Sequence, residues 1–315
     1  MRIVASIVAV CLVLIVGRAR AVQVETRPSS AEDAKAVALV EAESPLPFEF
    51  DVETTYIGKG DVERGERGDM VIRDFEGFQG RLRFVLTPMT KIGILRLGLQ
   101  IERYSFNYGR MAPIPSDLHS TNLIIGLDTE LSDKFLIRVE AEPGFYGTDY
   151  DDFGRDTFNV PVIIGGTYIY SSSLQFVFGI GIDAWRQYPV LPGGGVRWKF
   201  APQWTLNAVV PTPRLEFEPS ESLLFFAGAD LRGPSYRVEK DFGTLRGDTS
   251  LNHASIVYEE IRVGGGLEWK LSTAVKLALE GGFVPHRNFD FHRTQVRYHQ
   301  DGGAPYARIG FHAAF

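Results

Sequence analysis

The stretch YEEIRVGGGLEWKLSTAVKLALEGGF, Tyr258–Phe283, decides the fold class of this chain. Even-numbered positions carry mostly charged residues or glycine, and odd-numbered positions carry mostly aliphatic or aromatic residues, on both sides of Ser272-Thr273. A period of two is the pattern of a β-strand with one polar face and one apolar face. The stretch therefore predicts two long antiparallel strands joined by a short turn at Ser272-Thr273.

The same alternation recurs through residues 48–315 and predicts an all-β domain there. Many of the runs exceed the roughly 5–6 residues of an ordinary strand, and they suit tilted strands that cross a bilayer. Short connections such as Ser132–Lys134 alternate with long polar ones, among them Gly58–Val71, Gln187–Gly194 and His292–Gly303. Short turns at one end and long loops at the other are typical of outer-membrane barrels. We therefore predict an antiparallel up-and-down transmembrane β-barrel.

The number of strands depends on a proline-rich segment. Thirteen runs alternate, and two successive short turns, at Ala201–Gln203 and Pro219–Ser222, would then break the order of short and long connections. Pro211-Thr212-Pro213 lies between these turns, and proline is excluded from strand centres because it cannot donate to the ladder. A tight turn there gives fourteen strands, two of them too short to span a bilayer fully. Twelve strands are the alternative, and bacterial barrels usually have even counts.

The end of the chain carries the most specific local pattern. Apolar residues occupy every second position back from the terminal aromatic residue, at Phe315, Ala313, Phe311 and Ile309. This pattern resembles the outer-membrane assembly signal of bacterial barrels, and it implies the barrel-assembly machinery as a partner. Trp198, Trp204 and Trp269 fall on apolar faces near short turns, which predicts an aromatic girdle at the periplasmic side of the membrane.

Residues 1–21 read as a signal peptide, with the basic Arg2, the uncharged apolar run Ile3–Gly17 and the A-x-A site Ala19-Arg20-Ala21. Cleavage is expected near Ala21, and an uncleaved anchor is the alternative. Residues 22–47 are polar and are expected to form a linker, with or without a short helix, and a plug inside the barrel is the alternative. The barrel itself is expected over residues 48–315, in the outer membrane.

The composition argues against several kinds of site in the exported chain. Its only cysteine, Cys11, lies in the signal peptide, so disulfides, thiol catalysis and thiolate metal sites are excluded after cleavage. The chain has 33 basic and 39 acidic residues, and removal of the three signal-peptide arginines leaves 30 against 39, a net charge of −9. An acidic exported protein is a poor candidate for nucleic-acid binding. No cofactor is indicated, and the expected contacts are outer-membrane lipid and lipopolysaccharide.

Two stretches carry a family resemblance: LPGGGVRWKFAPQWTLNAVVPTPRLEFEPSESLLFFAGADLRGPSYRVE, Leu191–Glu239, and YEEIRVGGGLEWKLSTAVKLALEGGFVPHRNFDF, Tyr258–Phe291. Together they resemble an exported, porin-like bacterial β-barrel family catalogued as a domain of unknown function. The resemblance covers most of the barrel and implies an outer-membrane location. It implies no activity and transfers no catalytic residue.

The polar face of the strands predicts a lumen that carries charges of both signs. Its candidate lining residues are Arg81, Arg83, Arg96, Glu102, Asp128, Glu130, Arg138, Glu140, Glu142, Asp183, Arg197, Lys199, Asp230, Arg232, Glu260, Arg262, Glu268, Lys270, Lys276 and Glu280. Unpaired charge is costly in a narrow interior, so these groups are expected to pair across strands. Two hypotheses follow: a passive channel for small polar solutes, or a sealed structural or adhesion barrel that acts through its long extracellular loops.

Other motifs give weaker indications. The acidic segment Asp149–Asp156 is only partly like a calcium loop, because Phe153 stands where an acid is expected and no Glu closes it. The spacing of His286, His292 and His299 fits no defined metal motif. His119 and Ser120 are adjacent and should point to opposite faces of a strand. We therefore expect neither a metal site nor an enzyme, although a lipid-modifying or proteolytic barrel is a third hypothesis.

Overall fold

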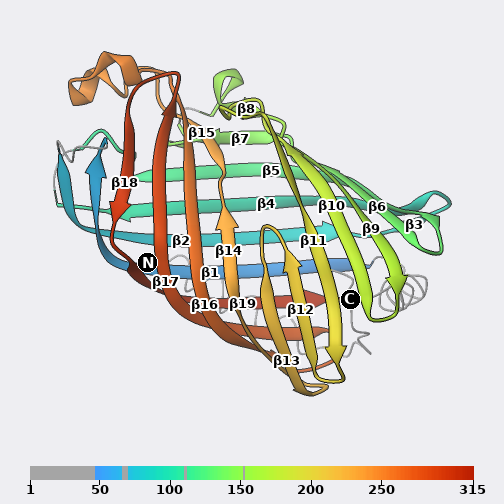
Figure 1. The fold of residues 1–315 in the computed structure, drawn as a ribbon. Helices are drawn as coiled ribbons and strands as arrows, with labels where there is room; N and C mark the ends of the chain where they lie inside the picture. The colour runs from blue at the N-terminus through green and yellow to red at the C-terminus, as the bar shows by residue number, and fades with distance from the viewer. Residues whose placement is uncertain (1–46, 66–69, 110–111, 152) are drawn as a thin grey trace.

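The computed structural model describes residues 47–65, 70–109, 112–151 and 153–315, which form one closed antiparallel β-barrel (Figure 1). β1 (Phe48–Arg64) closes it by pairing with β2 (Val71–Leu86) on one side and with β19 (Ala304–Ala314) on the other. Both chain ends of the barrel meet at the end with the short turns, where the Phe48 N–H donates to the Phe315 carbonyl. The predicted signal peptide and nearly all of the predicted linker lie outside the described residues.

Fourteen strands build the wall, which confirms the predicted fold and the larger strand count. Besides β1, β2 and β19 they are β4 (Gly93–Asn107), β5 (Asp117–Ser132), β6 (Phe135–Ala141), β9 (Val162–Ser171), β10 (Leu174–Ile182), β11 (Val190–Ala201), β12 (Trp204–Val209), β13 (Arg214–Ser220), β14 (Leu223–Arg232), β16 (Ser255–Lys270) and β17 (Val275–His292). The segment Pro211–Pro213 lies in the turn between β12 and β13, as the proline argument predicted.

Short segments extend these strands at their ends. They are β3 (Met89–Thr90), β7 (Gly144–Gly147), β8 (Phe158–Asn159), β15 (Ser235–Arg237) and β18 (Arg297–Asp301). Three single-turn 3-10 helices, η1 (Arg155–Thr157), η2 (Thr244–Arg246) and η3 (Thr249–Leu251), lie in the long loops. Among the described residues, no helix is long and apolar enough to cross a membrane.

Three of the predicted long loops are partly strand, which corrects their boundaries. β1 continues through Gly58 to Arg64 and pairs there with β2 and β18. β11 begins at Val190, inside the predicted loop Gln187–Gly194. β18 occupies part of His292–Gly303. In the first two segments, Gly58, Gly60, Pro192 and Gly193 interrupt the alternation of polar and apolar side chains, whereas backbone pairing does not depend on it.

One residue in two on each strand points away from the lumen, and most of these residues are apolar. The outward face of the barrel is therefore apolar. Phe84, Leu99, Ile125, Phe178 and Ile309 are typical members, and each is more than one third exposed. The predicted girdle residues Trp198, Trp204 and Trp269 lie on this face near the short turns. An outward apolar band with an aromatic border is what a strand barrel presents to lipid.

Candidate functional site

The structure brings many of the predicted lining residues together in ion pairs inside the barrel. The ion pair between Arg232 Nη2 on β14 and Glu53 Oε1 on β1, at 2.7 Å, shows this most directly. These strands are not neighbours in the sheet, since β16, β17 and β19 separate them. Their side chains can therefore meet only across the interior of the barrel.

Glu53 is the centre of an ionic network, here called the central cluster. Its carboxylate lies 3.0 Å from Arg81 Nη2, 3.5 Å from Arg308 Nη1 and 4.0 Å from Arg262 Nη1, in addition to its contact with Arg232. The cluster consists of Glu53, Arg81, Glu102, Asp230, Arg232, Glu260, Arg262, Glu280 and Arg308. It draws on seven strands, from β14 through β16, β17, β19, β1 and β2 to β4, so it ties distant parts of the wall together.

The deepest part of the central cluster is the pair Glu260–Arg262 on β16, whose side chains are fully buried. Arg262 also donates to Gln79 Oε1 at 2.5 Å and to Thr55 Oγ1 at 3.1 Å. Both acceptors are buried residues of β2 and β1, which do not pair with β16 in the sheet. A buried guanidinium needs several such partners, because removing it from water is costly.

Two further clusters lie nearer the short turns. In the β1–β6 cluster, Arg96 lies 2.9 Å from Glu49 and 3.1 Å from Glu140, and Glu140 also accepts from Arg83 at 2.8 Å. Arg138 and Asp128 complete this cluster at 2.5 Å.

The β11–β16 cluster lies at the same end of the lumen. Arg214 lies 2.6 Å from Glu216 and 2.7 Å from Glu268, and Arg197 lies 3.1 Å from Glu216. Arg81, Arg138 and Arg214 keep about 30% of their side-chain surface exposed. The lumen therefore contacts solvent at these levels.

The long-loop half of the lumen is filled by a different kind of packing, here called the aromatic core. Phe75, Phe106, Tyr258 and Phe289 pack with ring centroids 4.9–5.6 Å apart, as in edge-to-face or tilted aromatic pairs. Apolar residues from the loops, among them Phe242 in the segment before η2, complete a cluster of buried side chains. Tyr258 joins the core to the central cluster, because its hydroxyl donates to Glu260.

Some predicted lining residues stand apart from the three clusters. Asp183, at the long-loop end of β10, accepts from Asn159 at 2.9 Å and from Ser235 at 2.6 Å. Lys270 lies 3.5 Å from Glu218, and Glu130 and Lys199 are exposed near short turns. That any of these residues lines a solute path stays a prediction.

Sequence reasoning missed several members of these networks, notably Glu53, Glu49 and Arg308. The signal for β1 was present, since Glu49, Asp51 and Glu53 occupy every second position of the first strand. Arg308 lies between Ala307 and Ile309, the outward residues of the last strand, so the same alternation places it inward.

The weaker motifs do not assemble into a reactive site in the described residues. His119 faces Tyr150, with ring centroids 4.0 Å apart, whereas Ser120 pairs in register with Tyr146 on β7. In the described part of the chain, no three His, Cys, Asp or Glu side chains are grouped so that they could hold a metal ion. Position 152 of the acidic segment lies outside the described residues.

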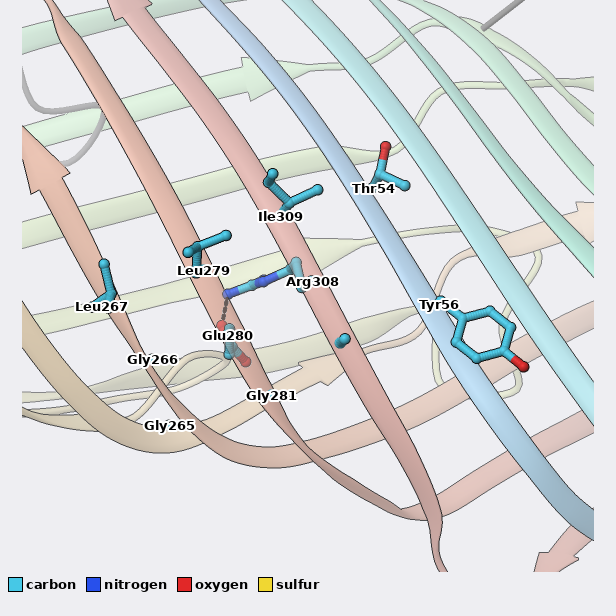
Figure 2. Close-up of a pocket in the computed structure, with 11 residues that line it drawn as sticks. Thr54, Tyr56, Gly265, Gly266, Leu267, Leu279, Glu280, Gly281, Arg308 and Ile309 are labelled. Atoms are coloured by element: carbon cyan, nitrogen blue, oxygen red, sulfur yellow. Dashed lines mark hydrogen bonds and ion pairs between the residues drawn. The ribbon is translucent and has the colours of Figure 1, made fainter. Parts of the chain in front are cut away.

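A hollow in the outer wall lies behind the central cluster (Figure 2). Its floor is formed where Gly265, Gly281 and Ala307 leave space on β16, β17 and β19, and Leu267, Leu279 and Ile309 flank it. Figure 2 also shows the contact between Arg308 and Glu280. This ion pair belongs to the lumen side, because Arg308 also contacts Glu53 and Asp230 there.

Comparisons with known proteins give one family match and several structural likenesses. A family model described as a domain of unknown function (DUF6268) matches residues 51–312. An outer-membrane channel from Pseudomonas putida F1 shares 9% identity over 86% of this chain and 97% of its own, with a TM-score of 0.47. The toluene transporter TbuX of Ralstonia pickettii shares 11% identity over 88% and 93%, with a TM-score of 0.43. No curated protein matches the chain.

Proposed function

This chain belongs to the family described as a domain of unknown function (DUF6268), and we propose that it is an outer-membrane channel that carries small polar solutes through a mixed-charge lumen. The observation that carries the proposal is the set of ion pairs that cross the interior of a barrel whose outer face is apolar. Both signs of charge are present in each cluster, so the wall favours polar solutes without strong selection for cations or anions.

The outer membrane is the proposed location, with the short-turn end in the periplasm and the long loops outside. The exposed apolar face and the tryptophans near the short turns support this orientation. Lipid and lipopolysaccharide would then contact the outer wall. The C-terminal strand, with Ile309, Phe311 and Ala313 on its outward face and Phe315 at the chain end, would engage the assembly machinery.

The aromatic core obstructs the path that this proposal requires, because it fills the lumen on the long-loop side. Passage along the barrel axis therefore requires that the loop segment between β15 and β16 move away from the core. Phe242 and Leu251, both buried, belong to this segment and pack into the core. A channel with this construction is expected to conduct in small or rare steps.

Planar-bilayer recording of the refolded protein tests the proposal. A variant in which residues 239–252 are replaced by a short Gly-Ser link removes the loop contribution to the core. We expect larger and more frequent steps from this variant than from the unaltered protein, in proportion to salt concentration. If both proteins insert and neither conducts, the channel is excluded.

The aromatic core also favours a second candidate, a sealed barrel that acts through its long loops. The buried rings would then be permanent structure, and the ion pairs below them would hold the barrel in shape. The two candidates differ in the loop-replacement variant, because a barrel that is sealed by its ion pairs as well as by its core would stay closed.

A further inference from the structure

In the described residues, the backbone pairing of the barrel wall is interrupted beside the short β12–β13 hairpin. β11 pairs with β12 only from Gly195 to Ala201, and β14 pairs with β13 only between Gly228 and Leu223. β12 and β13 have six and seven residues, whereas β16 and β17 have 16 and 18. Figure 1 shows the hairpin between the longer strands β11 and β14.

The edges of this side opening are defined by the last hydrogen bonds on each side. The Val210 N–H donates to the Gly194 carbonyl, and the Leu231 N–H donates to the Pro211 carbonyl. Beyond these bonds, the described structure pairs Val190–Gly193 only with β10. At the top, Ser235 donates to Asp183, and the guanidinium of Arg186 lies against Gly233.

The lower edge of the opening lies next to Gly195, where β11 and β12 approach each other closely. Its φ is +156°, and a Cβ there would meet the Ala208 carbonyl oxygen at 1.9 Å. Only glycine allows the backbones of β11 and β12 to approach this closely. The sheet is thus tightly joined up to Gly195, and it separates just beyond the end of β12.

Three lumen-facing positions next to the opening carry no charge, unlike the three ionic clusters. Ile163, Gly181 and Leu191 pair in register across β9, β10 and β11, and Ile163 is in register with the lumen-facing Glu140. Ile163 is 48% exposed and Leu191 is 39% exposed, so no side chain of the described residues covers them fully. Val190, Val210 and Leu231 form an exposed apolar rim.

The opening lies within the level that lipid would cover. Six residues at about 3.3 Å each, tilted by about 40°, rise roughly 15 Å, whereas the apolar band of a strand barrel is about 25 Å tall. The hairpin therefore ends well below the outer edge of the band. Because Leu231 and Val210 are exposed apolar residues at this level, the rim faces lipid rather than water.

We propose that this side opening admits small apolar molecules dissolved in the outer membrane into the lumen, where the row Ile163–Gly181–Leu191 receives them. The inference rests on the proposed channel function and adds a second route to it. The axial route is filled on the long-loop side by the aromatic core, whereas the side route bypasses that core. Its exit is the charged, solvent-contacting half of the lumen at the short turns.

Labelling with the apolar photoprobe trifluoromethyl-(m-iodophenyl)diazirine in proteoliposomes tests the opening, with labelled residues mapped by mass spectrometry. We expect adducts on the lumen-facing residues Ile163 and Leu191 as well as on outward residues such as Phe178. Gly181→Leu and Gly193→Leu should abolish the lumenal adducts and leave the outward ones. A Cβ at either glycine has no contact closer than 3.6 Å, so both variants should fold.

Gly281→Leu is the matched control, because Gly281 lies in the hollow of the outer wall and a Cβ there has 3.5 Å of clearance. It should leave the lumenal adducts unchanged. Absence of adducts on Ile163 and Leu191 in the unaltered protein, with normal labelling of Phe178, would overturn the side opening. Lumenal adducts that persist in both filled variants would overturn it as well. Bilayer conductance is a separate readout, so loss of the channel proposal would be recognised independently.

Discussion

The two halves of the lumen are filled by different kinds of contact, apolar packing in one and ion pairs in the other. The long-loop half packs aromatic rings such as Phe75, Phe106 and Phe289, all buried, and gains stability from apolar surface removed from water. The short-turn half pairs Arg96, Arg138 and Arg214 with carboxylates, and part of that surface stays wet. One half therefore resembles a protein core and the other the wall of a polar vestibule.

This difference shows that the alternation of a strand does not determine whether its inward side chains join an apolar core or an ionic cluster. The same strand β16 contributes Tyr258 to the aromatic core, Glu260 and Arg262 to the central cluster, and Glu268 to the β11–β16 cluster. Burial decreases along this strand from the long-loop end to the short-turn end. Substitutions at successive levels should consequently have different effects on stability and conductance.

The largest effect is expected from Phe289→Ala in the aromatic core. The ring is fully buried and contacts the rings of Phe75, Phe106 and Tyr258, so its removal leaves a cavity. We expect the free energy of unfolding to fall by about 3–5 kcal/mol, measured by urea titration in lipid or detergent micelles. Phe283→Ala is the control, because Phe283 is 62% exposed on the outer face. Equal losses from both variants would show that the long-loop half is not a core.

A somewhat smaller loss is expected where the two halves meet, from Glu260→Gln. This change removes the nearest carboxylate partner of the buried Arg262 guanidinium and leaves Glu53 at 4.0 Å. An uncompensated buried charge costs about 3 kcal/mol, again measured by urea titration. The double variant Glu260→Gln with Arg262→Met should recover most of the loss, since it removes the charge as well. No recovery would mean that the pair is not the source of the cost.

In the wet half, Arg138→Ala should alter selectivity more than stability. Arg138 is one third exposed in its pair with Asp128, so the loss of stability is expected to stay below about 1 kcal/mol. The lumen would become more negative, and the cation-to-anion permeability ratio should rise in bilayer recordings. Arg103→Ala, which removes the same charge from the outer face, should leave the ratio unchanged. A rise in both variants would place the effect outside the lumen.

The smallest effect concerns the loop that covers the aromatic core. The Ser250 hydroxyl, with help from Arg64, holds the pKa of Asp248 below its usual range. The stabilisation is therefore present at neutral pH and is lost as the pH falls through this lowered pKa. At pH 8, Asp248→Asn should speed tryptic cleavage after Arg246 by about two- to fivefold. Asp241→Asn is the control, with the same charge change in the same loop, and it should leave the rate unchanged.

Much of the architecture was predictable because strand alternation and turn chemistry are local properties. The proline segment at Pro211–Pro213 predicted the turn that completes fourteen strands, and the short strands beside it were expected to fall short of spanning. The extended parts of β1 and β11 were missed, because Gly58, Gly60 and Gly193 show no alternation. Those parts depend on partners that are distant in sequence.

The sequence by its alternation predicted which residues face inward, since the side-chain period of a strand is a property of its backbone. It also predicted that charges of both signs would share the lumen. Only the tertiary structure decided which of them meet: Glu53 and Arg232 are 179 residues apart and touch because the sheet closes on itself. Closure also decided that Phe289 packs on Phe75 and that backbone pairing ends early beside the short hairpin. Such contacts depend on the curvature and stagger of the whole barrel, which no local pattern contains.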